Sequence, residues 1–279
     1  MLPPDTHVHS EWSWDAVDGS MERTCAEAVR VGLPAIAFTE HTDFTSWLVD
    51  PTAVGALPAH LRGMVGPDGL LRHPPLDVNG YLESLQRCRD RFPELRIFSG
   101  LEVGEAHWCA EPVRALLASE PFERVLGSLH SLRLDGEYRL IDNLRPRPGS
   151  AWILREYLAE LLRMVESSDA FLVLAHIDYP LRRWGPTEGA YRPAAFEEQY
   201  RAVLRALAQG GRVLEVNTRV PLHPEVVRWW HEVGGTAVAF GSDAHVPWAV
   251  GSGFQEAAAM VEAHGFRAGR HPYDFWVRG

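Results

Sequence analysis

The feature that most constrains the fold of this 279-residue chain is a regular alternation of short apolar runs with longer amphipathic stretches. Seven runs are predicted to be extended, namely 3–9, 34–39, 95–101, 124–130, 171–176, 212–217 and 236–242. Apolar residues recur at helical spacing in 20–31, 80–91, 111–119, 150–167, 194–209, 223–233 and 253–264. Because strands that alternate with helices pair in parallel, seven such units predict an α/β fold, specifically a closed (β/α) barrel.

One segment interrupts this alternation. Residues 44–79 contain many Pro, Gly and Asp residues and have no clear period. We therefore predict a single domain over residues 1–279 with an irregular insertion at about 44–79 that lies over the mouth of the barrel. Such an insertion is either a lid or a simple surface excursion, and the sequence leaves both open.

The composition argues against several classes of protein. The formal net charge is −10 and no basic run appears, which disfavours an extended nucleic-acid surface but permits binding of a single phosphate. No apolar run approaches the length of about 20 residues that a membrane helix needs. The three cysteines are scattered and fit a reducing compartment, so we expect a cytoplasmic protein.

Side chains of the kinds that bind metals follow most of the predicted strands. They are His7, His9, Asp15, His41, Glu102, His130, His176, Asp243 and His245. Because the carboxyl ends of parallel barrel strands converge on one face, we expect these side chains to meet there. Imidazole and carboxylate without thiolate suit Zn²⁺, Mn²⁺ or Fe²⁺, and this set is too large for one four-coordinate ion. We predict two to three divalent ions that share a bridging carboxylate.

The remaining histidines lie in the insertion, in helical stretches and in other segments away from the strand ends. They are predicted not to bind metal, and they are His60, His73, His107, His223, His231, His264 and His271. The amidohydrolase type of metal barrel also opens with His-x-His, and many of its binuclear members use a carboxylated lysine as the bridge. All 27 basic residues here are arginine, which excludes that version and leaves a glutamate-bridged or mononuclear one open.

The order of the short motifs resembles that of the PHP (polymerase and histidinol phosphatase) family of metal-dependent phosphoesterases. The matching segments are 5–9 (DTHVH), 39–41 (TEH), 100–102 (GLE), 127–130 (GSLH), 175–178 (AHID) and 241–245 (GSDAH). They span most of the chain, and the resemblance implies a distorted, TIM-like barrel of seven strands.

The resemblance also implies a trinuclear metal centre. The first ion would be held by His7, His9, Glu102 and Asp243. Glu102 would bridge to a second ion, which is also held by His130 and His176. The third ion would be held by Asp15, His41 and His245.

Within the family, residues 215–218, residues 176–179 and the long early insertion resemble the branch that hydrolyses histidinol phosphate in histidine biosynthesis. The expected activity is metal-dependent hydrolysis of a small phosphomonoester, with a metal-bridging hydroxide as nucleophile. Four other functions stay open: a phosphodiesterase or nuclease, another small-molecule phosphoesterase, an amidohydrolase-type C–N hydrolase, and a non-catalytic metal-binding barrel.

Further side chains are expected to assist this reaction. Asp243 and His245 are candidates for moving a proton. Without lysine, arginine has to bind the phosphate, and we predict Arg183 and Arg219 because both follow strand ends. Glu215 is expected either to orient metal ligands or to satisfy backbone groups.

A pocket for an amine and an imidazole would use acidic and aromatic side chains near the mouth of the barrel. The insertion and neighbouring loops offer Asp43, Phe44, Trp47, Asp50, Trp12, Trp14 and Trp184. Each tryptophan is equally suited to covering the hydrophobic core. The sequence gives no indication of the oligomeric state.

Overall fold

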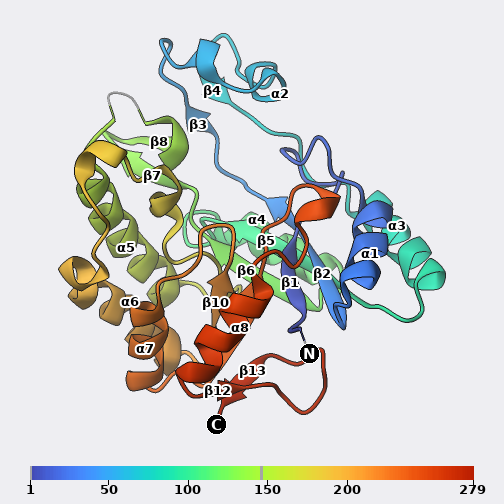
Figure 1. Ribbon diagram of the computed structural model, residues 1–279. Helices are drawn as coiled ribbons and strands as arrows, with labels where there is room; N and C mark the ends of the chain where they lie inside the picture. Colours follow the sequence, from blue (N-terminus) through green and yellow to red (C-terminus); the bar gives the residue numbers. More distant parts are fainter. Residues whose placement is uncertain (1, 145–146) are drawn as a thin grey trace.

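The computed structural model describes residues 2–144 and 147–279 and is built around a curled nine-stranded sheet (Figure 1). Seven strands pair in parallel in the order β1 (Asp5–Val8), β2 (Ala35–Thr42), β5 (Arg96–Gly104), β6 (Arg124–Ser128), β9 (Val173–Leu174), β10 (Val213–Asn217) and β11 (Ala237–Gly241). The predicted α/β class is confirmed, and a strand lies in each segment that the sequence predicts as extended.

The first and last parallel strands, β1 and β11, approach each other just beyond the carboxyl end of β11. Val8 forms an isolated parallel bridge with Ala244, and the backbone nitrogen of His9 donates to Ala244 O at 2.9 Å. The amino end of β11 instead pairs antiparallel with β13 (Trp276–Arg278), which pairs with β12 (Phe266–Arg267). These last two strands were not predicted from the sequence.

Helices follow the parallel strands along the chain, as predicted. They are α1 (Met21–Val31), α3 (Val78–Arg91), α4 (Ala110–Ser119), α5 (Ser150–Ser167), α6 (Glu197–Gln209), α7 (Pro224–Glu232) and α8 (Phe254–Ala263). Ser20 caps α1 by accepting from the backbone nitrogen of Arg23, and Gly32 ends that helix in the left-handed conformation with φ of 80°. Within the described residues, none of the helices has both the length and the apolar character needed to cross a membrane.

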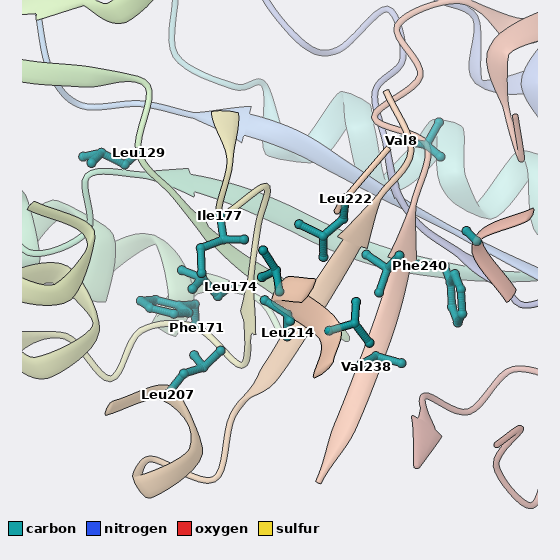
Figure 2. Close-up of a cluster of buried hydrophobic side chains, with 14 of the residues drawn as sticks. Val8, Leu129, Phe171, Leu174, Ile177, Leu207, Leu214, Leu222, Val238 and Phe240 are labelled. Carbon is teal, nitrogen blue, oxygen red and sulfur yellow. The ribbon is translucent and has the colours of Figure 1, made fainter. Parts of the chain in front are cut away.

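The two faces of the sheet carry different side chains. Large residues such as Leu174, Leu214 and Val238 lie on the face covered by the helices (Figure 2). The opposite face carries separate buried clusters, in which small residues such as Ala37 and Ala239 lie beside larger ones such as Phe98. Side chains alternate between the two faces along each strand. The side chains of this second face that lie at the carboxyl ends of the strands therefore come close together, next to these clusters.

Residues 44–79 contain short elements that the sequence did not predict. They are β3 (Trp47–Leu48), η1 (Val54–Ala56), α2 (Ala59–Arg62) and β4 (Leu70–Leu71), and β3 pairs antiparallel with β4. Trp47 and Leu71 belong to a small hydrophobic cluster of this segment, against which Trp14 and Leu140 pack. Figure 1 shows the segment at the end of the molecule opposite the two termini.

A hairpin also follows β6, formed by β7 (Ser131–Leu134) and β8 (Glu137–Leu140). Asp135 and Gly136 make its tight turn with φ of 54° and 85°. The remaining short helices are η2 (Ile141–Asn143), η3 (Tyr179–Arg183), η4 (Pro186–Glu188), η5 (Pro193–Phe196) and η6 (Pro247–Ala249).

Candidate metal centre

Glu102, at the carboxyl end of β5, lies at the centre of the histidines that the sequence predicts as ligands. Its Oε2 atom lies 3.3 Å from Nε2 of both His7 and His9, and 3.1 Å from His41 Nδ1. Its Oε1 atom lies 3.2 Å from His130 Nε2 and 2.7 Å from His176 Nε2. One buried carboxylate thus faces five imidazoles from the ends of four strands, β1, β2, β6 and β9, which is the position expected of a bridging ligand.

The other predicted ligands complete the cluster on either side of Glu102. Asp243 Oδ1 lies 3.6 Å from His9 Nε2 and 4.0 Å from His7 Nε2. Asp15 Oδ2 lies 3.0 Å from His245 Nε2 and 3.5 Å from His41 Nε2. All nine predicted metal ligands therefore lie in one continuous cluster.

The positions of these nitrogen and oxygen atoms suit binding of divalent cations better than direct hydrogen bonds between the side chains. Nε2 of His7 and Nε2 of His9 are only 3.1 Å apart and both point at Glu102. Glu102 Oε2 and His41 Nδ1 are buried without a hydrogen-bond partner. Four sets of three donors each lie within 4.8 Å: His9, His41 and His245; His7, His9 and Asp243; His7, Glu102 and His176; and His41, Glu102 and His130. Buried polar groups rarely stay unpaired, so this arrangement fits a metal site.

The close contacts in the cluster shift the pKa values of its members. Burial raises the pKa of Glu102, but the positive charges of His7 and His41 outweigh it and hold this pKa well below the ordinary value. Burial, together with the neighbouring His41 and His245, lowers the pKa of His9 well below its ordinary value. Burial also lowers the pKa of His7 and His41, but the neighbouring carboxylates outweigh it and raise both above the ordinary value. Glu102 is thus held as an anion, the form in which a carboxylate binds a metal.

Two ligands are held by backbone conformations that are rare for residues other than glycine. His176 has φ of 21° and Asp243 has φ of 53°. Such conformations persist where the surrounding structure holds them and are common at functional sites. Hydrogen bonds supply this support, because the backbone nitrogen of His176 donates to Glu215 Oε2 and that of Asp243 donates to His7 O.

Carboxylates behind the cluster orient the ligands. Glu215 Oε1 accepts from His7 Nδ1 at 2.6 Å, and Glu215 Oε2 accepts from His176 N at 2.6 Å and from Asn217 Nδ2 at 3.1 Å. Asp43 Oδ1 lies 3.2 Å from His130 Nδ1, so this acid supports a ligand and does not line the cavity next to the cluster. No local pattern indicates this position of Asp43, because its partner lies 87 residues away.

A cavity of about 540 Å³ opens directly onto the cluster. Arg182, Arg183 and Arg219 are the arginines on its wall. Arg219 Nη1 lies 3.1 Å from Asp243 Oδ1, whereas Arg183 is 58% exposed and pairs with Asp142 at 3.4 Å. Sequence reasoning missed Arg182, which is 15% exposed, donates to Asp243 Oδ2 and therefore lies closer to the ligands than Arg183.

The aromatic residues expected near the mouth separate into two groups. Trp14 lines the cavity, while Trp47 is fully buried in the hydrophobic cluster of the insertion. Trp12 and Trp184 pack against the main core. Of the histidines predicted not to bind metal, His60 lines the cavity, and none of them belongs to a candidate ligand set among the described residues.

Comparison with known proteins identifies the family. The model of the PHP domain family matches residues 5–219, which is most of the chain. The chain belongs to the PHP domain family. The match includes seven of the nine predicted ligands, and Asp243 and His245 lie beyond it.

Relatives of this PHP-domain chain match along nearly their whole length. The histidinol-phosphatase of Lactococcus lactis is 26% identical, with 94% of this chain and 91% of the relative covered. A probable histidinol-phosphatase of Thermotoga maritima is 29% identical, with 94% and 92% covered. The crystal structure of the Lactococcus lactis histidinol phosphate phosphatase, complexed with zinc, L-histidinol and phosphate, has a TM-score of 0.77, 23% identity and 95% coverage of each chain. A putative histidinol phosphatase from Listeria monocytogenes has a TM-score of 0.72, 17% identity and coverage of 91% and 99%. The fold is therefore that of these phosphatases.

Proposed function

We propose that this PHP-domain chain is a metal-dependent phosphomonoesterase that hydrolyses L-histidinol phosphate to L-histidinol and phosphate. The observation that carries the proposal is the convergence of nine metal-type side chains, Glu102 among them, beside a cavity lined by arginines. Relatives of the same length that are named histidinol-phosphatases support the choice of substrate.

The proposed centre holds two to three divalent ions, with zinc, manganese and iron as the candidates. Glu102 would bridge these ions, and the eight other residues that would hold them are His7, His9, Asp15, His41, His130, His176, Asp243 and His245. When bound, such ions lower the pKa of a coordinated water and neutralise the charge of a phosphoryl group. The zinc bound in the Lactococcus lactis structure is in keeping with this choice.

The phosphate is bound by guanidinium groups at the inner end of the cavity. Arg182 is held over the ring of Tyr179, with its guanidinium carbon 4.5 Å from the ring centroid, and Arg219 reaches the cavity from the end of β10. Both contact Asp243, so a phosphoryl group at the metal centre lies within reach of both. A planar guanidinium can donate two hydrogen bonds to one phosphate. Arg183, at the outer rim, stays a weaker candidate for this role.

The leaving group occupies the outer part of the cavity. Its wall combines apolar faces from Trp14, Leu61 and Leu140 with polar groups from His60 and Asp142. This mixture suits a substrate with an imidazole ring and an amine. Asp243 and His245, the two candidates for moving a proton, would both be metal ligands in this proposal, and Asp243 is also held as an anion by two arginines. Neither side chain therefore supplies a proton to the leaving alkoxide in the metal-loaded site.

Two finer structural proposals accompany this function. The seven parallel strands act as one distorted barrel, supported by the bridge between Val8 and Ala244 that brings β1 next to the end of β11. Residues 1–279 act as one domain in which the insertion of residues 44–79 roofs the cavity, supported by the presence of Pro58, His60 and Leu61 on its wall.

The test is phosphate release by the purified full-length chain loaded with zinc or manganese. Histidinol phosphate is compared with p-nitrophenyl phosphate, a monoester without the imidazole, and with bis-p-nitrophenyl phosphate, a diester. We expect the highest kcat/KM for histidinol phosphate and loss of activity after chelation. A higher kcat/KM for the diester would instead favour the phosphodiesterase function, and no release from any of the three would refute the phosphatase proposal.

A further inference from the structure

Behind the metal centre, one buried serine hydroxyl connects a carboxylate to two of the histidine ligands. Ser13 Oγ lies 2.5 Å from Glu40 Oε2, 3.0 Å from His9 Nδ1 and 3.1 Å from the backbone nitrogen of His41. All four residues are buried. Neither Ser13 nor Glu40 is on the wall of the cavity, so neither can touch the substrate.

The direction of these hydrogen bonds follows from counting hydrogens. A serine hydroxyl has one hydrogen and two lone pairs, and an ionised carboxylate only accepts. Ser13 therefore donates to Glu40. The backbone nitrogen of His41 can only donate, so it takes one lone pair of Ser13 Oγ. The other lone pair accepts from His9 Nδ1–H, which leaves Nε2 of His9 without a hydrogen.

The free nitrogen of His9 points into the ligand cluster. Its Nε2 atom lies 3.3 Å from Glu102 Oε2, 3.6 Å from Asp243 Oδ1 and 3.1 Å from His7 Nε2. Only the tautomer with its hydrogen on Nδ1 offers a lone pair at this point. The hydroxyl of Ser13 thus selects the tautomer of His9 that can bind a metal.

Glu40 also holds the loop that carries another ligand. Its Oε1 atom accepts from Ser10 Oγ at 2.5 Å, and its Oε2 atom accepts from Ser10 N at 3.0 Å. Since Glu40 binds both Ser10 and Ser13, it fixes the turn that leads directly to Asp15. Asp15 in turn lies 3.5 Å from His41 Nε2.

We propose that Glu40 and Ser13 are positioning residues, which fix the tautomer of His9 and the places of His41 and Asp15 for metal binding. Glu40 lies next to the ligand His41 in the sequence but on the other face of β2, so it supports the centre from behind without entering it. The inference rests on the metal site of the proposed function and is independent of the substrate.

The test measures zinc binding and the tautomer of His9, without measuring activity. The full-length chain is freed of metal and titrated with zinc against a competing chromophoric chelator. Ser13→Ala is expected to weaken the affinity for at least one ion by about 10- to 100-fold, the usual effect of losing a group that orients a ligand. Ser13→Thr keeps the hydroxyl and is expected to restore the affinity. Ser84→Ala, at a buried serine on α3 that bonds Arg87, is the matched control and is expected to bind zinc normally.

Nitrogen NMR shifts of the His9 ring report the tautomer directly. We expect the hydrogen on Nδ1 in the wild type and in Ser13→Thr, and a substantial population with the hydrogen on Nε2 in Ser13→Ala. Wild-type zinc affinity in Ser13→Ala would overturn the proposal, as would a wild-type His9 with its hydrogen on Nε2. Neither result depends on whether histidinol phosphate is the substrate.

Variants of Glu40 provide the same test if Ser13→Ala fails to fold. In the wild type, Glu40 Oε2 accepts from both the backbone nitrogen of Ser10 and the hydroxyl of Ser13. In Glu40→Gln, the amide oxygen must take this position because the backbone nitrogen can only donate, so the oxygen can still accept from Ser13. We therefore expect Glu40→Gln to keep the tautomer of His9 and bind zinc like the wild type, and Glu40→Ala to lose both properties. Equal zinc binding by the two variants would contradict the proposed role.

Discussion

The substitution Glu215→Gln tests whether the carboxylate behind the metal centre sets the tautomer of His7. Glu215 Oε2 accepts a hydrogen bond from the backbone nitrogen of His176, and this nitrogen can only donate. In the variant, the amide oxygen has to take this position, together with the hydrogen bond from Asn217 Nδ2. The amide NH₂ group then faces His7 Nδ1, which in the wild type donates to Glu215 Oε1 at 2.6 Å.

Two donors cannot share a hydrogen bond, so His7 in the variant moves its hydrogen to Nε2. That atom faces Glu102 Oε2 at 3.3 Å and is the one that would bind the ion. The variant loses a hydrogen bond to a charged acceptor, worth about 1.5–3 kcal/mol. At 1.4 kcal/mol for each factor of ten, zinc affinity is expected to fall by about 10- to 150-fold.

The assay is a zinc titration of the metal-free chain, followed by kcat for histidinol phosphate at saturating zinc. Glu198→Gln, at an exposed position on α6, is the matched control and should bind zinc like the wild type. At saturating zinc, part of the lost kcat should return, because mass action restores the bound state. A Glu215→Gln chain that binds zinc within about twofold of wild type would refute the tautomer argument, since this is below the smallest effect expected from the lost hydrogen bond.

Three further predictions concern other parts of the site. Arg182→Ala is expected to lower kcat/KM for histidinol phosphate by about 100-fold. Arg183→Ala removes an exposed ion pair and should lower kcat/KM by less than about fivefold. A larger loss in Arg183→Ala than in Arg182→Ala would contradict the assigned roles. Gly241→Ala places a Cβ atom 2.0 Å from Glu215 Oε1 and should lower the free energy of unfolding, measured in denaturant, by about 1–3 kcal/mol. Gly55→Ala is the control and should leave the free energy of unfolding unchanged, because its Cβ atom meets nothing within 4 Å. Zinc at about 100 times its dissociation constant should stabilise the chelated protein by about 2.7 kcal/mol per ion, and an unchanged thermal midpoint would count against the metal site.

The strands and the ligand set could be predicted because both depend on local patterns. Apolar runs of strand length separated by amphipathic stretches indicate the seven parallel strands without knowledge of any contact. Parallel strands place their carboxyl ends at one edge, so a histidine or acid after each strand is brought to the same place. The positions of His7, Glu102 and Asp243 therefore followed from the order of the strands alone.

The arginines needed information that the sequence lacks. Arg182 and Arg183 are adjacent in the short helix η3, where consecutive side chains point about 120° apart. One of them meets Asp243 and the other meets Asp142 at the rim. Which one faces the metal centre depends on how η3 packs against the rest of the protein, and no local pattern specifies that.

Within this chain, the sequence alone determined the class of fold and predicted which side chains cluster as candidate metal ligands. Only the tertiary structure revealed what orients those ligands, because Glu215 and His7 are 208 residues apart and Asp43 and His130 are 87 apart. The short elements of the insertion and the pairing of β13 with β11 likewise depend on contacts between distant segments. Local periodicity reports how a segment folds, whereas a hydrogen bond between distant side chains exists only after the strands have assembled around a common centre.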